Sequence, residues 1–541
     1  MLGSVATALA FGLYSSVEAP WFALGWVGLV PWLAALDRLT SARASAAAGW
    51  FMSVVFCWAV FPWFPDMVAD YGGYSTALAA LVFVAAAPLI QPQFIVFALA
   101  RVAAVRATSG GWAARAVVGA GAYVGAEWSI AKVMEDTIGM GQFASPWIRQ
   151  SADLFGAHGL TFLLVVFNEG VLAAVRAWRR RPRRFGAEVA SPVAVCAVIL
   201  LGLNAYGAAR LSQLESEDEA AEMRVAIVQA NIGHYDRLRA EVGSFEAVRR
   251  VLEAHFAMSA EAASAGSVDL VLWPETVYPT TFGSPKSDDG AAFDRAIGAF
   301  VARQGVPLVF GAFDRDASGE YNAAVLLEPS AGGSVEFEVY RKVRLFPFTE
   351  YIPGLLDSAP MRRWLPWAGT WRPGDGARVL PLRARDGRTI AIAPLICYDA
   401  VDPALAIEAV RGGAEVLVTL SNDSWFAYPG AQRLILVASA FRGIETRRPH
   451  VRATPTGISA AIDATGRLME VIDSGERRVA VATVRPSSRP PTWFVRWGNW
   501  LPPVAMATAV LVLAASFAST RRPARRAAEH KRILLTPKSG A

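Results

Sequence analysis

One cysteine, Cys397, stands at the end of an apolar run, Thr389–Ile396, that is typical of a buried strand. A helix-like run, Pro403–Arg411, follows it. The N-terminus of a helix carries a partial positive charge, so this position is predicted to favour a thiolate, the reactive form of cysteine. The alternative is an inert buried cysteine, since free cysteine is among the most buried residue types.

Two further charged residues are expected near Cys397. A β-branched run, Val268–Trp273, leads directly to Glu275, and Lys342 lies in a strand-like run that is followed by an apolar loop and a carboxylate, Glu350. In open α/β sheets, sites form outside the carboxyl ends of the strands. We therefore predict that these side chains converge, although they are far apart in the sequence.

Three such groups match the needs of acyl transfer. The reaction requires a nucleophile that carries the acyl group, a base that takes protons, and a positive group for the oxyanion. Cys397, Glu275 and Lys342 fill these roles in that order. Each residue alone has a structural explanation, as a buried thiol, a helix cap or one of many cations, but three matching motifs together favour chemistry.

The composition indicates a membrane protein with a water-exposed part. Of 541 residues, 54% are hydrophobic and only 18% are charged, and the mean hydropathy is +0.33, whereas a soluble protein is about one quarter charged. The net charge of +6 gathers beside apolar segments, which indicates membrane topology and not nucleic-acid binding. The other cysteines, Cys57 and Cys196, lie inside apolar runs, and no spacing suggests a metal site or disulfide framework, so we expect no metal and no cofactor.

Apolar segments predict eight membrane spans, and basic residues follow each even-numbered segment, as at Arg38, Arg101 and Arg176. This alternation places both termini in the cytosol and the long polar segment on the other side. The predicted spans are Leu2–Tyr14, Trp21–Leu36, Gly49–Phe64, Thr76–Leu99, Ala116–Ile130, Leu160–Trp178, Pro192–Tyr206 and Leu501–Thr520.

The expected domains are a membrane bundle at 1–210, an acidic linker at 211–222, an extracytoplasmic domain at 223–484, a return segment with the last span at 485–520, and a basic tail at 521–541. In the extracytoplasmic domain, short β-branched runs alternate with helical stretches. Strands that are apolar on both faces and alternate with helices predict an α/β domain.

The motifs around these residues resemble the carbon–nitrogen hydrolase (nitrilase) superfamily, and the membrane spans narrow the resemblance to its apolipoprotein N-acyltransferases. The motifs that carry the resemblance are Trp273-Pro274-Glu275, Tyr340-x-Lys342-x-x-Leu345-x-Pro347-Phe348-x-Glu350, Cys397-Tyr398 and Ser421-Asn422-Asp423-x-Trp425-Phe426.

The resemblance implies an αββα sandwich docked on an eight-helix transmembrane bundle. It implies a triad with Glu275 as general base, Lys342 as oxyanion stabiliser and Cys397 as nucleophile. The residues that it places in support of the triad are Glu350, Tyr398, Asp399 and Trp425.

The implied reaction takes an acyl chain from a phospholipid onto the cysteine and then passes it to the N-terminal amine of a diacylglyceryl-cysteine lipoprotein. The implied location is the cell inner membrane, with the catalytic domain in the periplasm and the protein acting as a monomer. Four positions depart from the usual family residues: Asp399 replaces Glu, Thr349 and Ala427 each replace Gly, and Pro455 replaces Asn.

Aromatic residues near the motifs have two open interpretations. Phe346, Trp364, Trp367 and Phe426 either contact the lipid substrates or pack the domain onto the bundle. Two other functions also stay open. One is a membrane-tethered amidase or nitrile hydrolase with the same triad, and the other is an inactive lipoprotein-binding homologue, which the departures at Asp399 and Pro455 motivate.

Overall fold

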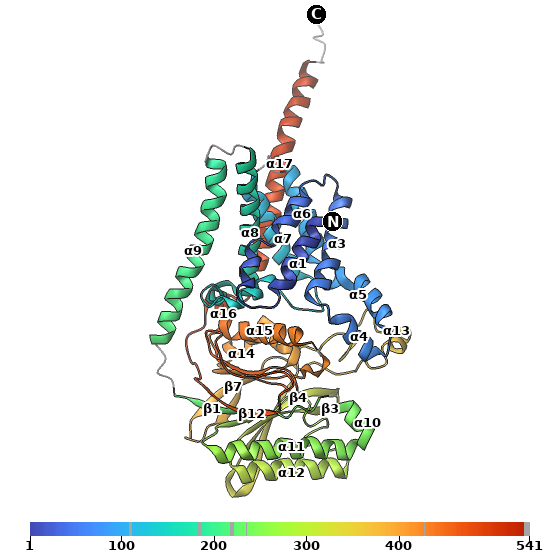
Figure 1. Cartoon of the computed structure of the whole chain (residues 1–541), viewed down its shortest axis with the longest axis vertical. Helices are drawn as coiled ribbons and strands as arrows, with labels where there is room; N and C mark the ends of the chain where they lie inside the picture. Colours follow the sequence, from blue (N-terminus) through green and yellow to red (C-terminus); the bar gives the residue numbers. More distant parts are fainter. Residues whose placement is uncertain (108–110, 181–185, 217–220, 234, 427, 535–541) are drawn as a thin grey trace, which may run out of the picture.

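The computed structural model describes residues 1–541 except 108–110, 181–185, 217–220, 234, 427 and 535–541, and it leaves out some side chains, among them Trp425 and 519–534. A helical bundle and an α/β unit lie end to end along the long axis of the molecule (Figure 1). The fold class predicted from the sequence, a nitrilase-like sandwich on a membrane bundle, is confirmed.

Every predicted apolar segment falls on helices of the bundle. Two of the predicted segments are divided. Trp21–Leu36 begins as a short 3-10 helix, and Thr76–Leu99 bends by 48° at a break between Ile90 and Gln93. The helices are α1 (Leu2–Tyr14), η1 (Trp21–Trp26), α2 (Val30–Leu36), α3 (Ala42–Val60), α4 (Phe64–Gly72), α5 (Thr76–Ile90), α6 (Gln93–Ala107), α7 (Trp112–Ser129), η2 (Ile138–Ala144), η3 (Ile148–Ser151), α8 (Ala152–Arg180), α9 (Ala187–Ser216) and α17 (Leu501–Leu534).

Among the described residues, four helices are long and apolar enough to cross a membrane, or five if the bent pair α5–α6 forms one span. The apolar helices Leu2–Tyr14 and Trp21–Leu36 are shorter. The count of eight spans therefore stays a prediction. Helix α9 continues to Ser216, so residues 211–216, which we expected in the acidic linker, extend this helix.

The α/β unit contains two six-stranded sheets with the strand orders β12-β1-β2-β3-β4-β5 and β11-β10-β9-β8-β7-β6. Apolar side chains of both sheets form one core between them, for example Leu272 and Val418. The strands are β1 (Met223–Gln229), β2 (Leu270–Leu272), β3 (Leu308–Asp316), β4 (Gly319–Pro329), β5 (Val335–Arg341), β6 (Leu380–Arg383), β7 (Thr389–Ile396), β8 (Val416–Leu420), β9 (His450–Ala453), β10 (Ser459–Ile462), β11 (Leu468–Ile472) and β12 (Arg478–Val484).

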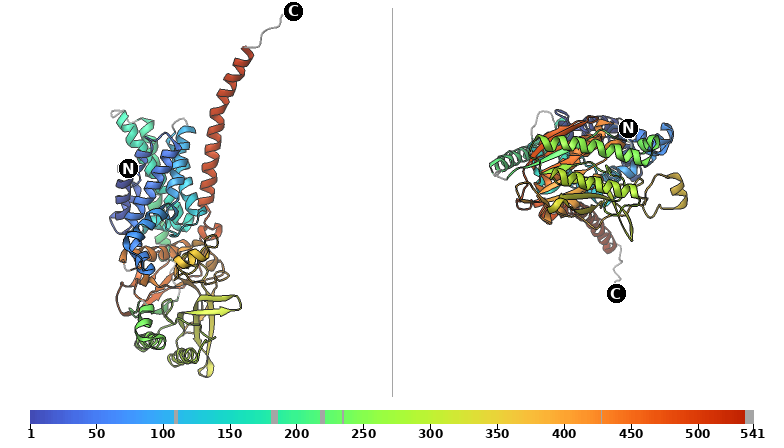
Figure 2. Two further views of the ribbon diagram at one scale, coloured as in Figure 1. Left: turned by 90° about the vertical axis from the view of Figure 1, so that its right-hand side faces the viewer. Right: turned by 90° about the horizontal axis from the view of Figure 1, so that it is seen from below.

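Helices cover both outer faces of this sandwich. Helices α11 (Ser244–Ala265) and α12 (Asp288–Gln304) lie side by side across the first sheet, on the side away from the bundle (Figure 2). Helices α14 (Pro403–Arg411) and α15 (Pro429–Thr446) lie between the second sheet and the bundle (Figure 1). The remaining short helices are α10 (Tyr235–Val242), η4 (Ala331–Gly333), α13 (Ala359–Trp364), η5 (Cys397–Val401), η6 (Asp423–Trp425) and α16 (Trp493–Trp497).

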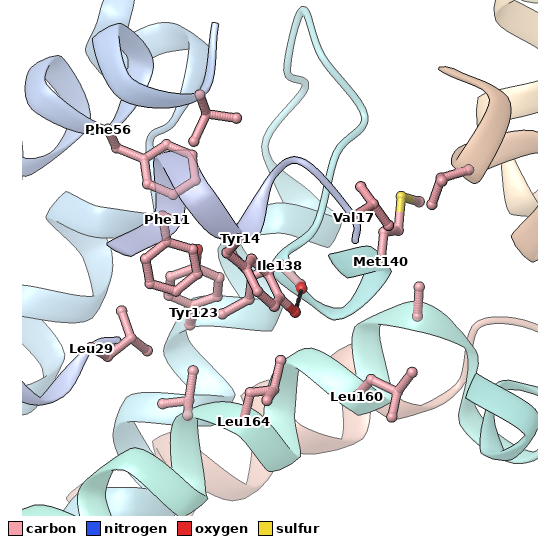
Figure 3. Close-up of a cluster of buried hydrophobic side chains, with 14 of the residues drawn as sticks. Phe11, Tyr14, Val17, Leu29, Phe56, Tyr123, Ile138, Met140, Leu160 and Leu164 are labelled. Carbon is pink, nitrogen blue, oxygen red and sulfur yellow. Dashed lines mark hydrogen bonds between the residues drawn. The ribbon is translucent and has the colours of Figure 1, made fainter. Parts of the chain in front are cut away.

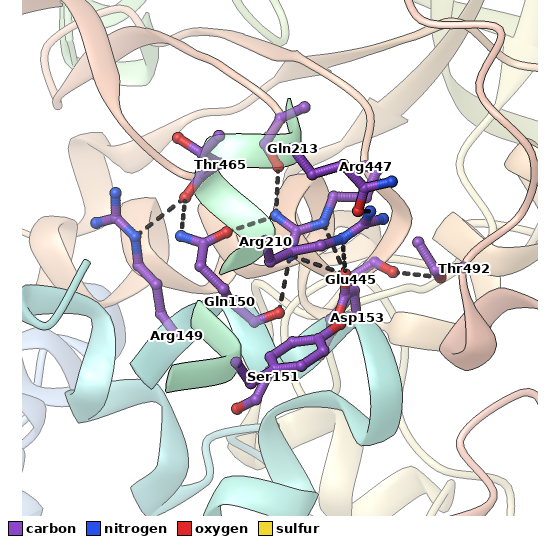
Figure 4. A network of polar contacts seen from close by, with 12 residues as sticks. Arg149, Gln150, Ser151, Asp153, Arg210, Gln213, Glu445, Arg447, Thr465 and Thr492 are labelled. Atoms are coloured by element: carbon purple, nitrogen blue, oxygen red, sulfur yellow. Dashed lines mark hydrogen bonds and ion pairs between the residues drawn. The ribbon is translucent and has the colours of Figure 1, made fainter. Parts of the chain in front are cut away.

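A buried polar network joins α15 to the start of α8 (Figure 4). The guanidinium of Arg447 donates to Asp153 Oδ2 at 2.9 Å and to the side-chain oxygen of Gln150 at 2.6 Å. Asp153 also accepts from Arg210 of α9 at 2.9 Å. Arg447 and Asp153 are both almost fully buried, so neither charge has water as a substitute partner. The α/β unit is thereby fixed to two helices of the bundle.

Replacing Arg447 by alanine is expected to destabilise the protein strongly. Removing one partner of a buried ion pair leaves an uncompensated charge, which typically costs about 3–5 kcal/mol; Arg210 still pairs with Asp153, so we expect the lower end of this range. Thermal unfolding in detergent measures the effect. The matched control is Arg249→Ala on α11, whose ion pairs with Glu246 and Glu253 are exposed, and it should leave the midpoint unchanged. Equal midpoints for the two variants would contradict the structural role of Arg447.

Candidate active site

Glu275, Lys342 and Cys397 each follow the end of a strand. Glu275 follows β2 and Lys342 follows β5, both of the first sheet, whereas Cys397 follows β7 of the second sheet. Lys342 is 1% exposed and Glu275 is 7% exposed. The three residues therefore lie at the carboxyl ends of strands from both sheets. This is the convergence that we predicted from the positions of these residues after strands in the sequence.

The Lys342 ammonium lies between two carboxylates. Its Nζ donates to Glu350 Oε1 at 2.9 Å and to Glu275 Oε1 at 3.4 Å. The side-chain amide of Asn322, on β4, donates to the same two carboxylates at 3.2 and 2.7 Å. The sequence analysis did not assign a role to Asn322, because an amide in the middle of a strand carries no signal of its own.

Burial and charge set the protonation of this cluster. Burial raises the pKa of Glu275 above its usual value, and the Lys342 ammonium opposes that rise. Burial alone would lower the pKa of Lys342, but the carboxylates of Glu275 and Glu350 outweigh it and hold the pKa well above its usual value. Lys342 is therefore a permanent positive charge, while Glu275 is a carboxylate with an increased affinity for protons.

Cys397 opens the turn η5 with a positive φ of 49°, a conformation that is strained for a residue other than glycine. Burial, and after it the Glu275 carboxylate, raise the pKa of its thiol to about 12, although the Lys342 ammonium opposes the shift. The prediction that this position favours a thiolate is therefore wrong, because burial favours the neutral thiol and raises its pKa. The thiol has to transfer its proton to a base as it reacts.

Asp399 holds the turn that begins at Cys397 to the loop that follows Lys342. It is fully buried, and its carboxylate accepts four hydrogen bonds, from Tyr340 Oη at 2.9 Å, Ile396 N at 2.9 Å, Val343 N at 3.2 Å and Arg344 N at 2.7 Å. The shorter aspartate therefore reaches its partners at a position where the family usually has glutamate. Thr349, a second departure, donates its hydroxyl to the carbonyl of Phe346 at 3.1 Å. Nothing in the structure explains Pro455, and Ala427 lies outside the described residues.

Tyr398 connects the same turn to the bundle. Its hydroxyl donates to the carbonyl of Val133, in the loop after α7, at 3.0 Å, and its ring lies edge-on to Phe346 with centroids 5.1 Å apart. The backbone of Trp425 ends the turn η6, and its side chain lies outside the described residues. The loop after α7 thus contacts the residue beside Cys397.

An apolar cavity joins Cys397 to the membrane bundle. Its empty volume is about 1050 Å³, its mouth included, and its wall combines residues of both parts of the chain. Phe11, Tyr14, Phe56, Ile138 and Met140 form part of the wall on the bundle side (Figure 3). The lining residues from the α/β unit include Phe346, Cys397, Tyr398, Phe426 and Leu434.

The four aromatic residues that we considered as substrate contacts divide into two groups. Phe346 and Phe426 line the cavity. Trp364 and Trp367 do not; they pack near Tyr74 of the bundle, with ring centroids 6.3 and 5.9 Å from it. The sequence analysis missed every lining residue from the bundle. In the described part of the chain, no cluster of side chains is arranged to hold a metal ion.

Comparisons with known proteins agree with this architecture. The family model described as "Carbon-nitrogen hydrolase" matches residues 224–492, and the model described as "Apolipoprotein N-acyltransferase N-terminal domain" matches residues 5–169. The chain is 25% identical to the apolipoprotein N-acyltransferase of Chlorobaculum tepidum, over 91% of this chain and 92% of that one. It is 28% identical to the enzyme of the same name from Sinorhizobium medicae, over 89% of this chain and 87% of that one.

A solved structure of an amidase from Nesterenkonia sp. is 19% identical and covers 51% of this chain and 92% of that chain, with a TM-score of 0.34. The matches to the two family models define the class of this protein: a carbon–nitrogen hydrolase unit joined to a membrane bundle. The chain belongs to the apolipoprotein N-acyltransferase family.

Replacing Asp399 by asparagine is expected to lower the free energy of unfolding by about 1–3 kcal/mol. The asparagine NH₂ group replaces one of the two carboxylate oxygens, so the buried N–H or O–H groups that donated to that oxygen lose their acceptor. Chemical or thermal unfolding in detergent measures this change. The control is Asp386→Asn in an exposed turn, which should leave stability unchanged. If both variants unfold alike, Asp399 does not hold the turn of the nucleophile.

The acylation rate is expected to fall as the pH decreases through about 6. Burial raises the pKa of Asp399 to about 6 and also raises that of Glu275. The roles expected for them, general base for Glu275 and support of the turn for Asp399, require the ionised forms. Each carboxylate therefore becomes protonated at a higher pH than an exposed carboxyl group. Single-turnover acylation of Cys397 across pH 4.5–8 measures the effect, and a rate that stays constant down to pH 4.5 would contradict these assignments.

Proposed function

We propose that this protein transfers a fatty acyl chain from a phospholipid, through a thioester on Cys397, to the N-terminal amine of the diacylglyceryl-cysteine of a lipoprotein. The observation that carries the proposal is the cavity in which Cys397, beside a buried carboxylate–ammonium cluster, faces an apolar wall of the membrane bundle. The names of the relatives point to the same reaction.

In the first half-reaction, Glu275 takes the thiol proton as Cys397 Sγ attacks the ester carbonyl carbon. Lys342 stabilises the oxyanion that forms. The ester C–O bond then breaks, and Glu275 returns the proton to the leaving oxygen. The products are a thioester on Cys397 and a lysophospholipid. A thiol with a raised pKa needs such a base, because little thiolate exists near neutral pH.

In the second half-reaction, the neutral amine of the lipoprotein attacks the thioester carbonyl, and Lys342 again stabilises the oxyanion. Glu275 accepts the proton that the nitrogen loses. The C–S bond breaks, Sγ leaves as a thiolate, and the proton on Glu275 restores the thiol. The product is an amide, and the enzyme is regenerated without net gain or loss of protons.

We propose the cytoplasmic (inner) membrane as the location, with the α/β unit on the periplasmic side. Basic residues support this orientation, because Arg179 and Arg180 end α8 at the end of the bundle far from the α/β unit (Figure 1). Lysine and arginine favour the cytoplasmic side of a membrane. We further propose that the protein acts as a monomer, since one chain supplies Glu275, Lys342, Cys397 and both walls of the cavity.

Reconstitution in vesicles that contain phosphatidylethanolamine with a labelled acyl chain tests the proposal. We expect wild-type protein to carry label that neutral hydroxylamine releases, and to pass it to a synthetic diacylglyceryl lipopeptide. Cys397→Ser should carry none. The control Cys196→Ser, which changes a half-buried cysteine on α9, should behave as wild type. Amide hydrolysis without any labelled protein would instead support the amidase, and lipopeptide binding without labelling would support the inactive homologue.

A further inference from the structure

Two phenylalanines of the bundle form the part of the cavity wall that lies farthest from the α/β unit along α1 and α3. Along α1, the lining begins at Phe11 and continues with Tyr14. Along α3, it begins at Phe56 and continues with Val60. On each helix, the later lining residue is therefore three or four positions closer to the C-terminal end, about one turn.

The C-terminal ends of both helices face the α/β unit. The segment after α1 reaches it through an ion pair between Glu18 and Arg433 of α15. The segment after α3 reaches it through Trp63, whose ring lies edge-on to Phe426 with centroids 5.1 Å apart. Because a helix rises about 1.5 Å per residue, the two phenylalanines lie roughly 5 Å deeper in the bundle than the next lining residues of their helices.

The two rings contact each other and are backed by further rings. Phe11 and Phe56 are 1% and 2% exposed, and their ring centroids are 5.6 Å apart (Figure 3). Behind Phe56 lies the fully buried ring of Phe94, at 4.9 Å, which in turn lies edge-on to Trp32 at 5.4 Å. Neither Phe94 nor Trp32 lines the cavity. A chain that enters from the α/β side therefore meets a packed aromatic layer at this end.

We infer that Phe11 and Phe56 set the longest acyl chain that this protein transfers. Cys397 itself lines the cavity, so the acyl chain of the thioester is fixed at one end to Sγ, and its methyl end is the part that extends toward the bundle. A well-packed wall accepts additional methylene groups only with strain. This inference rests on the proposed function.

The expected dependence on chain length is a step and not a gradual trend. A methylene group gains little when it moves from the bilayer into the cavity, because lipid tails are as apolar as the wall. Chains shorter than the limit should therefore react at similar rates. A longer chain has to displace the aromatic layer or buckle, and overpacking of this kind should lower the rate about fivefold or more.

The test measures single-turnover acylation of Cys397 by phosphatidylethanolamines in which one chain is varied over a series of even lengths and the other is kept constant. The lysophospholipid that is released shows which chain was transferred. We expect the wild-type rate to drop at one length of the transferred chain and to be independent of the length of the other chain.

Two kinds of variant should move this drop in opposite directions. Phe11→Ala and Phe56→Ala remove part of the aromatic layer, so the drop should move to longer chains. Val60→Phe places a ring one turn closer to the α/β unit, so the drop should move to shorter chains. One turn is about 5.4 Å, and an extended chain advances roughly 1.3 Å per carbon, so the expected shift is about four carbons.

The matched control is Phe97→Ala. Phe97 is a fully buried phenylalanine of α6 whose ring packs against Trp32 and Tyr123, with centroids 5.3 and 6.1 Å apart, and it does not line the cavity. This variant also leaves a hole in the bundle and should lower stability, but it should keep the wild-type length limit. A shift of the limit in this variant would mean that general loosening of the bundle, and not the two lining rings, sets the length.

A wild-type rate without a drop, or a drop that follows the chain left behind, would overturn the inference. An unchanged limit in Phe56→Ala would overturn it as well, and if that variant fails to fold, an unchanged limit in Val60→Phe does so.

Alkyl methanethiosulfonates of the same chain lengths separate this inference from the proposed function. They attach an S-alkyl chain to Cys397 Sγ through a disulfide and release methanesulfinate, so they need no phospholipid reaction. If wild type forms no thioester with any phospholipid, the proposed function fails, while labelling of Cys397 should still show the length limit and its shifts. Labelling that is equal at every length, or absent at every length, would overturn the inference.

Discussion

A buried ammonium between two carboxylates is the constraint on which the site depends. Lys342 loses its water on folding, and its ion pairs with Glu275 and Glu350 compensate for that loss. A buried charge without partners is unfavourable, so the contacts among these three segments stabilise the fold as well as the site. The same arrangement keeps Lys342 positive, as its proposed role in stabilising an oxyanion requires, and leaves Glu275 with an increased proton affinity. Stability and chemistry therefore depend on the same contacts.

The bundle contributes to the site and does more than hold the protein in a membrane. It supplies one wall of the cavity beside Cys397, and its loop after α7 accepts a hydrogen bond from Tyr398, the residue next to the nucleophile. The Arg447–Asp153 pair fixes the two parts of the chain to each other. The bundle thereby adds apolar surroundings beside the thiol, which a soluble domain on a simple tether would not offer.

The sequence predicted the parts of the structure that depend on local patterns. Strands that are apolar on both faces and end in polar residues located Glu275 and Cys397 at one edge of the sandwich. The prediction of a stabilised thiolate was wrong, because the helix terminus is visible in the sequence while the burial of Cys397 is not. The wall residues Phe11, Phe56 and Trp63 were not predicted either, since the packing of distant helices decides which apolar side chains face a cavity. For the same reason, Phe346 and Phe426 could not be separated from Trp364 and Trp367 in advance.

The most direct measurement is the mass of the N-terminal lipopeptide released from a lipoprotein that matured in cells with this protein as the sole candidate enzyme. With wild type, we expect a diacylglyceryl-cysteine whose amine carries a third acyl chain, and with Cys397→Ser we expect the free amine. A free amine in the presence of well-expressed wild type, or a third chain that persists in Cys397→Ser, would contradict the account.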